Sequence, residues 1–208
     1  AILFDETIRQ KTNDNSTFPE FLNNIGIMPG IKVDTGAKDF SCHANEKITE
    51  GLDNLSQRME DYKSFGAKFA KWRAVITIGD KIPSIACMVA NSHALARYAS
   101  ICQEVDIVPI VEPEVLMDGS HDIKKCFEVT NEMQSTLFEE LDKLNINNSG
   151  IILKPNMVTP GSTCEEKASA EEIAEFTVRC LGNNIPKDVP GIAFLSGGQS
   201  DQDASNNL

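Results

Sequence analysis

Short apolar segments alternate along this chain with longer stretches in which apolar residues recur every three or four positions. Several short segments are apolar almost throughout, as in strands that are buried on both faces of a parallel sheet. They predict strands at residues 1–4, 30–34, 69–76, 107–111, 150–154 and 191–196. The longer stretches predict helices at residues 19–24, 55–65, 84–104, 122–144 and 169–183, and residues 201–208 resemble the start of another helix.

Strands that alternate with helices at this spacing predict a parallel sheet joined by crossover helices. A doubly wound open sheet and a (β/α)8 barrel both fit this pattern. No Gly-x-Gly-x-x-Gly motif follows the first strand, which counts against a nucleotide-binding open sheet. Almost every predicted strand ends in charged or polar residues, at the end where the catalytic side chains of a barrel converge. We therefore predict an α/β protein with the (β/α)8 TIM-barrel fold, of which about six of eight βα units are present.

The predicted domain organisation is a single barrel domain over residues 1–208. Because the chain begins inside a strand-like segment and stops inside a helix-like one, we expect a partial sequence that is truncated at both ends. A barrel without two of its strands has open edges with unpaired backbone groups. We therefore expect residues 1–208 alone to be poorly stable and inactive. The polar segment 36–49 is expected to be the least structured part of the chain.

The composition fits an ordinary globular domain, with 41% apolar and 24% charged residues. A net charge of −12 argues against a general nucleic-acid-binding protein, although it leaves room for a local basic pocket. No apolar run has the length of a membrane span, and the apolar start lacks the basic residues of a signal peptide. The six cysteines form no Cys-x-x-Cys pair and the three histidines lie far apart. We predict reduced, mostly buried thiols in a cytosolic protein, and no metal site.

Charged residues interrupt two of the predicted strands. Alternation along a strand places Lys71 and Arg73 on one side and Trp72 on the other. Cations inside a barrel need an anionic partner, whereas the simpler interpretation is a solvated strand end. The same alternation places Glu112 and Glu114 on one face, where neighbouring carboxylates destabilise each other and suit acid–base chemistry. The alternative is that they form salt bridges with the two cations, and both interpretations can hold together.

Lys154 ends an apolar strand, where a lysine contributes nothing to stability. Burial and a nearby cation both favour the neutral amine, which is a nucleophile toward a carbonyl group. The alternative is an ordinary surface lysine with a buried aliphatic stem. Further along, Ser196, Gly197 and Gly198 follow the last predicted strand, and their backbone N–H groups are suited to hold a phosphate. Taken alone, such a segment is usually only a turn.

Six separated motifs, in order and in register over essentially the whole chain, resemble class I fructose-bisphosphate aldolase. They are GIKVD at residues 30–34, FAKWR at 69–73, LARYA at 95–99, IVPIVEPE at 107–114, LKPNM at 153–157 and FLSGGQS at 194–200. The resemblance implies an eight-stranded barrel that reversibly cleaves fructose 1,6-bisphosphate to dihydroxyacetone phosphate and glyceraldehyde 3-phosphate in glycolysis and gluconeogenesis. It implies catalysis without a metal or another cofactor. It also implies a cytoplasmic homotetramer with a small phosphorylated sugar as substrate and with no nucleic-acid or membrane partner.

The resemblance also assigns roles to individual residues. The Schiff-base lysine of the family corresponds to Lys154, its main proton-transfer glutamate to Glu112, and its second carboxylate to Glu114. The lysine that assists at the carbinolamine and the substrate hydroxyl groups corresponds to Lys71. The phosphate-binding positions are Ser196, Gly197 and Gly198 for the first phosphate, and Lys32 and Arg73 for the second.

The chain departs from the family pattern at several points. Thr35 stands where the family usually has a lysine, and the rim segment 37–47 diverges. The family's first strand with a catalytic aspartate, its last strand with a phosphate-binding arginine, and its C-terminal tail with a functional tyrosine have no counterpart here. Transaldolase and deoxyribose-phosphate aldolase are rival Schiff-base barrels, but they lack Lys-Trp-Arg and Glu-Pro-Glu in this spacing. A non-catalytic, aldolase-like binding protein is an alternative of another class, and the retained catalytic residues count against it.

Overall fold

The computed structural model describes all 208 residues, and its central feature is a five-stranded parallel sheet. The strand order is β1-β2-β5-β6-β7. The bounds are β1 Ile2–Leu3, β2 Gly30–Lys32, β5 Phe69–Ile76, β6 Val108–Val115 and β7 Ile152–Leu153. Five of the predicted strands are therefore confirmed, although β1, β2 and β7 are shorter than expected.

The sixth predicted strand, at residues 191–196, is reduced to a single bridge between Leu153 and Ile192. Backbone bonds still follow a parallel pattern there, because Ala193 donates to Leu153 and Leu195 donates to the carbonyl of Pro155. Pro155 has no N–H group, so the backbone hydrogen bond that would lie between these two in a regular ladder is missing. The proline interrupts the ladder, and the segment runs beside β7 without forming a regular strand.

The predicted helices are all present, and one short helix was not predicted. The bounds are α1 Asp5–Arg9, α2 Phe18–Asn24, α3 Leu55–Ser64, α4 Ile85–Glu104, α5 Ile123–Lys143, α6 Ala170–Asn184 and α7 Asp201–Asn206, with a 3₁₀ turn at Asn148–Gly150. The side chain of Ser84 caps α4, and Ser169 with Glu172 forms a capping box at the start of α6. None of the helices combines the length and the apolar character that crossing a bilayer requires.

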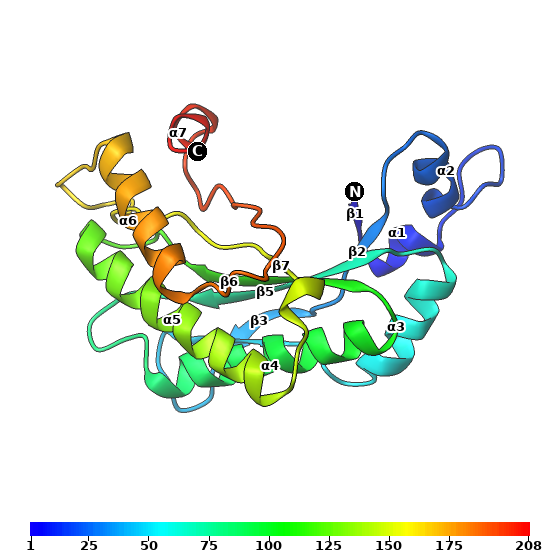
Figure 1. The fold of residues 1–208 in the computed structure, drawn as a ribbon, viewed down its shortest axis with the longest axis horizontal. Helices are drawn as coiled ribbons and strands as arrows, with labels where there is room; N and C mark the ends of the chain where they lie inside the picture. Colours follow the sequence, from blue (N-terminus) through cyan, green and yellow to red (C-terminus); the bar gives the residue numbers. More distant parts are fainter.

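The long helices cover one face of the sheet, and the short α7 lies on the opposite side (Figure 1). Helix α4 packs on β5 and β6, α5 packs on α4 and β6, and α6 packs on α5. Large buried side chains fill this layer, among them Trp72, Leu95, Met133 and Leu137. A doubly wound sheet has helices on both faces, whereas a barrel places them all outside. Strands ordered as in the chain, with the long helices on one side, are therefore typical of part of a barrel.

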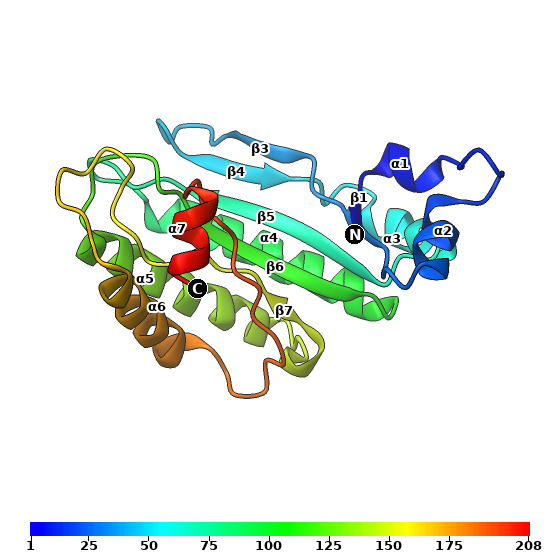
Figure 2. The same ribbon diagram turned by 90° about the horizontal axis from the view of Figure 1, so that it is seen from above.

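The prediction that residues 36–49 are the least structured segment was wrong. Strands β3 (Gly36–Asp39) and β4 (Lys47–Glu50) form an antiparallel hairpin that runs beside β5 (Figure 2). Polar groups attach this hairpin to α4: the Asn91 side chain accepts from the Thr49 N–H and donates to the Lys47 carbonyl. Glu46 in turn accepts from the N–H of Ser84 at the start of α4. Because the hairpin is held by polar contacts, its sequence lacks the apolar pattern of a core strand.

Candidate active site

The pairing of β5 with β6 sets the direction of the charged side chains. Arg73 lies opposite Glu112 in the parallel register. Trp72 faces the helices, is fully buried and stacks on Tyr98 of α4 with ring centroids 5.6 Å apart. Lys71 and Arg73 line a cavity on the other face of the sheet. The predicted division of Lys71 and Arg73 from Trp72 is therefore confirmed.

A single buried carboxylate joins the two lysines of the site. Oε2 of Glu112 accepts a 2.7 Å hydrogen bond from Lys71 Nζ, and Oε1 accepts a 2.6 Å bond from Lys154 Nζ. Glu112 is only 2% exposed, whereas the Lys154 side chain is 24% exposed toward the cavity. The lysine amine thus reaches the cavity while its proton acceptor lies beneath it. This arrangement can pass a proton between Lys154 and Glu112 without a further carrier.

Glu114 and Arg73 form a second ion pair in the same cavity. Nε of Arg73 donates to the buried Oε2 of Glu114. This bond raises the pKa of the Arg73 guanidinium, against the opposing effect of burial. With Lys71, Lys154 and Arg73 set against two glutamates, the site carries three positive and two negative charges. A net positive pocket in a chain with a net charge of −12 is suited to an anionic ligand.

The cavity has a volume of about 490 Å³ and brings together eight of the nine predicted site residues. Its lining consists of Lys71, Arg73, Glu112, Glu114, Lys154 and the segment Phe194, Leu195, Ser196, Gly197, Gly198. Gly197 and Gly198 adopt φ values of 62° and 87°, which glycine accepts without strain. The backbone N–H groups of Ser196, Gly197 and Gly198 donate to no other group of the protein. Three free donors beside a positive cavity form a suitable cradle for a phosphate.

Lys32, the ninth predicted residue, lies on the neighbouring strand β2, opposite Lys71. It does not line the same cavity. Its Nζ instead donates to Asp34, at 2.5 Å from Oδ1 and 3.1 Å from the carbonyl oxygen. Asp34 was not among the predicted site residues, although its side chain is only 3% exposed. The signal in the sequence was its place two residues after Lys32 in a strand that ends in polar residues.

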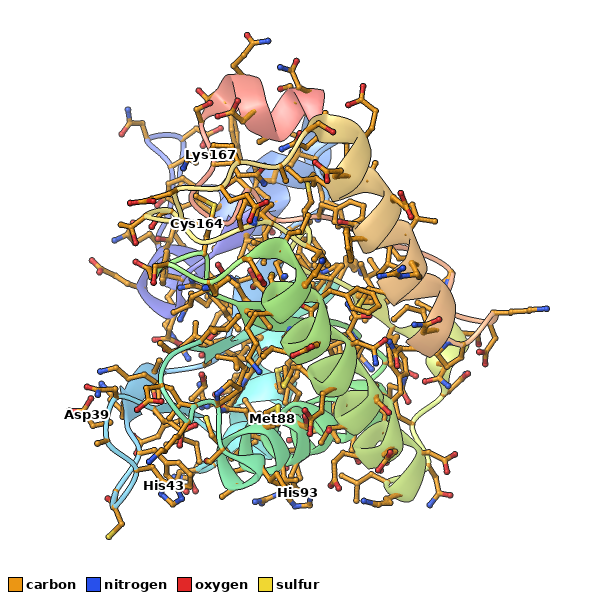
Figure 3. The ribbon with its side chains drawn as sticks, turned by 90° about the vertical axis from the view of Figure 1, so that its left-hand side faces the viewer. Asp39, His43, Met88, His93, Cys164 and Lys167 are labelled. Atoms are coloured by element: carbon orange, nitrogen blue, oxygen red, sulfur yellow. The ribbon has the colours of Figure 1, made fainter.

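A second hollow shares no residue with the cavity of the lysines and glutamates. This larger hollow of about 910 Å³ is bounded by α3, α4 and the hairpin, and is lined by residues that include Arg58, Tyr62 and Arg97. No group of three or more His, Cys, Asp or Glu side chains has an arrangement that could hold a metal ion. Figure 3 shows His43 and His93 at the opposite end of the molecule from Cys164.

The six cysteines form no disulfide, and all except Cys42 are buried. Burial raises the pKa of the Cys87 thiol to about 11 and that of Cys180 to about 12. Such thiols are weak nucleophiles at neutral pH. The prediction of mostly buried, unpaired thiols is confirmed, and the chemistry of the site falls to its lysines and glutamates.

Comparison with known proteins gives a consistent result. The family model described as glycolytic, fructose-bisphosphate aldolase class-I, matches residues 1–208. A probable fructose-bisphosphate aldolase class 1 of Xanthomonas axonopodis pv. citri is 57% identical over 208 residues, which are all of this chain and 62% of that protein. Fructose-bisphosphate aldolase 5, cytosolic, of Arabidopsis thaliana is 52% identical over the same residues, which cover 58% of its length. The chain thus spans about three fifths of the length of these relatives.

A solved structure is similar along the entire chain. It is fructose-bisphosphate aldolase from Plasmodium falciparum, in a ternary complex with TRAP and a small-molecule inhibitor. The superposition has a TM-score of 0.96 at 44% sequence identity, and covers 100% of this chain and 60% of that one. The predicted fold, part of a (β/α)8 barrel, is confirmed by this similarity and by the parallel sheet.

Proposed function

The chain belongs to the class I fructose-bisphosphate aldolase family, and from this premise we propose that it carries the catalytic lysine of a Schiff-base aldolase. The proposed reaction is the reversible cleavage of fructose 1,6-bisphosphate to dihydroxyacetone phosphate and glyceraldehyde 3-phosphate, in glycolysis and gluconeogenesis. The observation that carries the proposal is the 2.6 Å hydrogen bond from Lys154 Nζ to Glu112. It joins a nucleophile to a proton acceptor at the wall of a positively charged cavity.

The first half of the reaction forms the covalent intermediate. Lys154 passes a proton to Glu112, and the free amine attacks the C2 carbonyl of the ketose to give a carbinolamine. Glu112 then protonates the C2 hydroxyl, which leaves as water, and the nitrogen becomes an iminium. Glu112 is a carboxylate again at this point, so it is ready to accept a second proton.

The second half breaks the carbon–carbon bond. Glu112 takes the proton of the C4 hydroxyl, the C4 aldehyde forms, and the electron pair of the C3–C4 bond moves into the iminium to give an enamine. After the aldehyde leaves, Glu112 returns the proton to C3, and water releases the ketone from Lys154. One carboxylate thus serves each proton transfer, which is consistent with its burial between two lysines.

The remaining residues bind and orient the substrate in this proposal. Lys71, bonded to the other oxygen of Glu112, assists at the carbinolamine and the hydroxyl groups. Glu114 holds Arg73. The first phosphate is assigned to Ser196, Gly197 and Gly198, whose free N–H groups support this role, and the second to Lys32 and Arg73. Binding both phosphates fixes the reacting carbons relative to Lys154.

The wider biological setting is also part of the proposal. We expect a single barrel domain, a cytoplasmic homotetramer, no metal or other cofactor, and no nucleic-acid or membrane partner. Two Arabidopsis relatives are named cytosolic, which supports the proposed compartment. A small phosphorylated sugar is the proposed ligand, and the net positive charge of the cavity supports it.

An assay of the full-length protein tests the reaction. Triose phosphates released from fructose 1,6-bisphosphate are measured with coupling enzymes, with and without prior treatment of the protein by EDTA. We expect cleavage that is unchanged by EDTA and abolished by Lys154→Met. Cleavage that disappears with EDTA and returns with a divalent metal would contradict the proposal. A stable protein that cleaves no ketose phosphate would instead support the non-catalytic alternative.

A further inference from the structure

Strand β2 leaves the sheet just after Lys32, and the side chain of Asp34 takes over its contacts with β5. The last regular backbone bond on this side runs from Val33 N–H to the Lys71 carbonyl. Two residues further along β5, the N–H of Arg73 meets Oδ2 of Asp34 at 3.3 Å in place of a strand carbonyl. The other carboxylate oxygen accepts from Gly36 N–H at 3.1 Å, where the hairpin begins.

Thr49 of the hairpin contacts the backbone carbonyl of Arg73, the β5 residue whose N–H group donates to Asp34. Its hydroxyl donates a 2.8 Å hydrogen bond to the carbonyl of Arg73, and its own N–H is fixed by Asn91 of α4. Thr49 is 3% exposed. The backbone of Arg73 is therefore held at its N–H by Asp34 and at its carbonyl by Thr49, although no regular strand pairs with it on this side.

Asp34 also fixes the ammonium of Lys32 at 2.5 Å. The desolvation cost of a buried carboxylate is offset here by the donors that surround Asp34. Two of them belong to cationic residues, Lys32 through its ammonium and Arg73 through its backbone N–H. These are the two residues assigned to the second phosphate in the proposed function.

We propose that Asp34 and Thr49 are positioning residues that determine the preference for a substrate with a second phosphate, by fixing Lys32 and Arg73 where β2 leaves the sheet. The inference rests on the proposed function. It concerns only the end of the substrate that is distant from Lys154, because neither residue contacts Lys154 or Glu112. Their loss is therefore expected to affect fructose 1,6-bisphosphate and to spare fructose 1-phosphate, which has no second phosphate.

The test compares the two substrates in the full-length enzyme and in the variants Asp34→Ala and Thr49→Val. Loss of a hydrogen bond is expected to raise KM for fructose 1,6-bisphosphate about threefold in Thr49→Val and about tenfold or more in Asp34→Ala, with kcat little changed. The kcat/KM for fructose 1-phosphate is expected to stay within about twofold. Thr177→Val is the matched control, because Thr177 is also a buried threonine whose hydroxyl bonds a backbone group, that of Val158. It is expected to leave the ratio of the two kcat/KM values unchanged.

Equal losses toward both substrates would overturn the proposal, because they would indicate a general structural role. A lower KM for fructose 1,6-bisphosphate in Asp34→Ala would also overturn it, because Asp34 would then compete with the phosphate for Lys32. If Asp34→Ala does not fold, Thr49→Val decides alone, since it is nearly isosteric and leaves every charge in place. A wild-type enzyme that cleaves neither substrate would be a failure of the proposed function, which this comparison distinguishes from a failure of the positioning role.

Discussion

Lys154 and Glu112 are joined by a 2.6 Å hydrogen bond between the residue that follows β7 and the middle of the adjacent strand β6. Lys71 of β5 reaches the other oxygen of the same carboxylate. Three neighbouring strands thus contribute one charged side chain each to a single chain of contacts. The register of the sheet brings these three side chains together. Substitution of the carboxylate between the two lysines therefore tests the proposed mechanism.

Replacement of Glu112 by glutamine removes the only carboxylate that contacts both lysines. If this group carries the protons, kcat of the full-length enzyme should fall by about 10²- to 10⁴-fold. Steady-state cleavage of fructose 1,6-bisphosphate measures the loss, and circular dichroism checks that the fold is kept. Glu175→Gln on the exposed surface of α6 is the matched control and should retain full activity. A Glu112→Gln enzyme within about threefold of wild type would be incompatible with the assigned role.

Two glycine-to-alanine substitutions should change stability in opposite directions. A Cβ on Gly161 would lie 2.2 Å from the Gly119 carbonyl oxygen, where backbone meets backbone. Gly161→Ala should therefore lower the free energy of unfolding by about 1–3 kcal/mol or more. Gly182 lies within α6 and nothing surrounds its added Cβ, so Gly182→Ala should raise the free energy of unfolding by about 0.5–1 kcal/mol. Urea unfolding of the full-length protein measures both, and effects of the same sign would contradict the described packing.

The pH dependence of stability should contain a contribution from His121. Both of its ring nitrogens are buried without a hydrogen-bond partner, and burial lowers the pKa of the imidazole despite the nearby Asp122. In the unfolded chain this histidine takes up a proton near pH 6.5, whereas in the folded protein it stays neutral to lower pH. Protonation therefore favours the unfolded state, and the contribution to stability is lost as the pH falls below about 6.5.

Thermal or urea unfolding between pH 7.5 and pH 5.5 measures this contribution. His121→Gln should lose less stability over this interval than the wild-type protein. His43→Gln, in the partly exposed turn between β3 and β4, is the control for replacing a histidine elsewhere in the chain. Identical profiles for all three proteins would show that His121 does not titrate as its burial requires.

Strand β6 shows what the sequence could predict and what it could not. The apolar run predicted a strand at residues 107–111, but β6 continues through Pro113 to Val115. The N–H groups of Val108 and Leu116 donate to carbonyls of the β5 segment, at Lys68 and Ile76. The even-numbered residues of β6 therefore direct their N–H groups toward β5. Pro109 and Pro113 therefore face β7, which pairs only with Ile110 and Val111. A proline is tolerated where no neighbouring strand needs a donor, and that fact depends on strand order, not on local sequence.

The candidate site was predictable to the extent that it follows from alternation along strands. Lys71, Arg73, Glu112 and Glu114 alternate with buried neighbours, so their common face could be predicted before any pairing was known. Alternation could place Asp34 on the same side as Lys32, but it could not reveal the contact of Asp34 with Arg73, nor any role for Thr49. Their importance arises because β2 ends early and a hairpin folds back over β5, which are tertiary relationships between residues far apart in the chain. The polar sequence of the hairpin indicated a loop because its partners are polar groups on α4.

The most direct test of the account is to identify the lysine that forms the covalent intermediate. The full-length enzyme is incubated with dihydroxyacetone phosphate, reduced with sodium borohydride, digested and analysed by mass spectrometry, in parallel with a Lys154→Arg variant. A single reduced adduct is expected on Lys154, and none in the variant. An adduct on Lys71 or on any other lysine, with Lys154 unmodified, would contradict it.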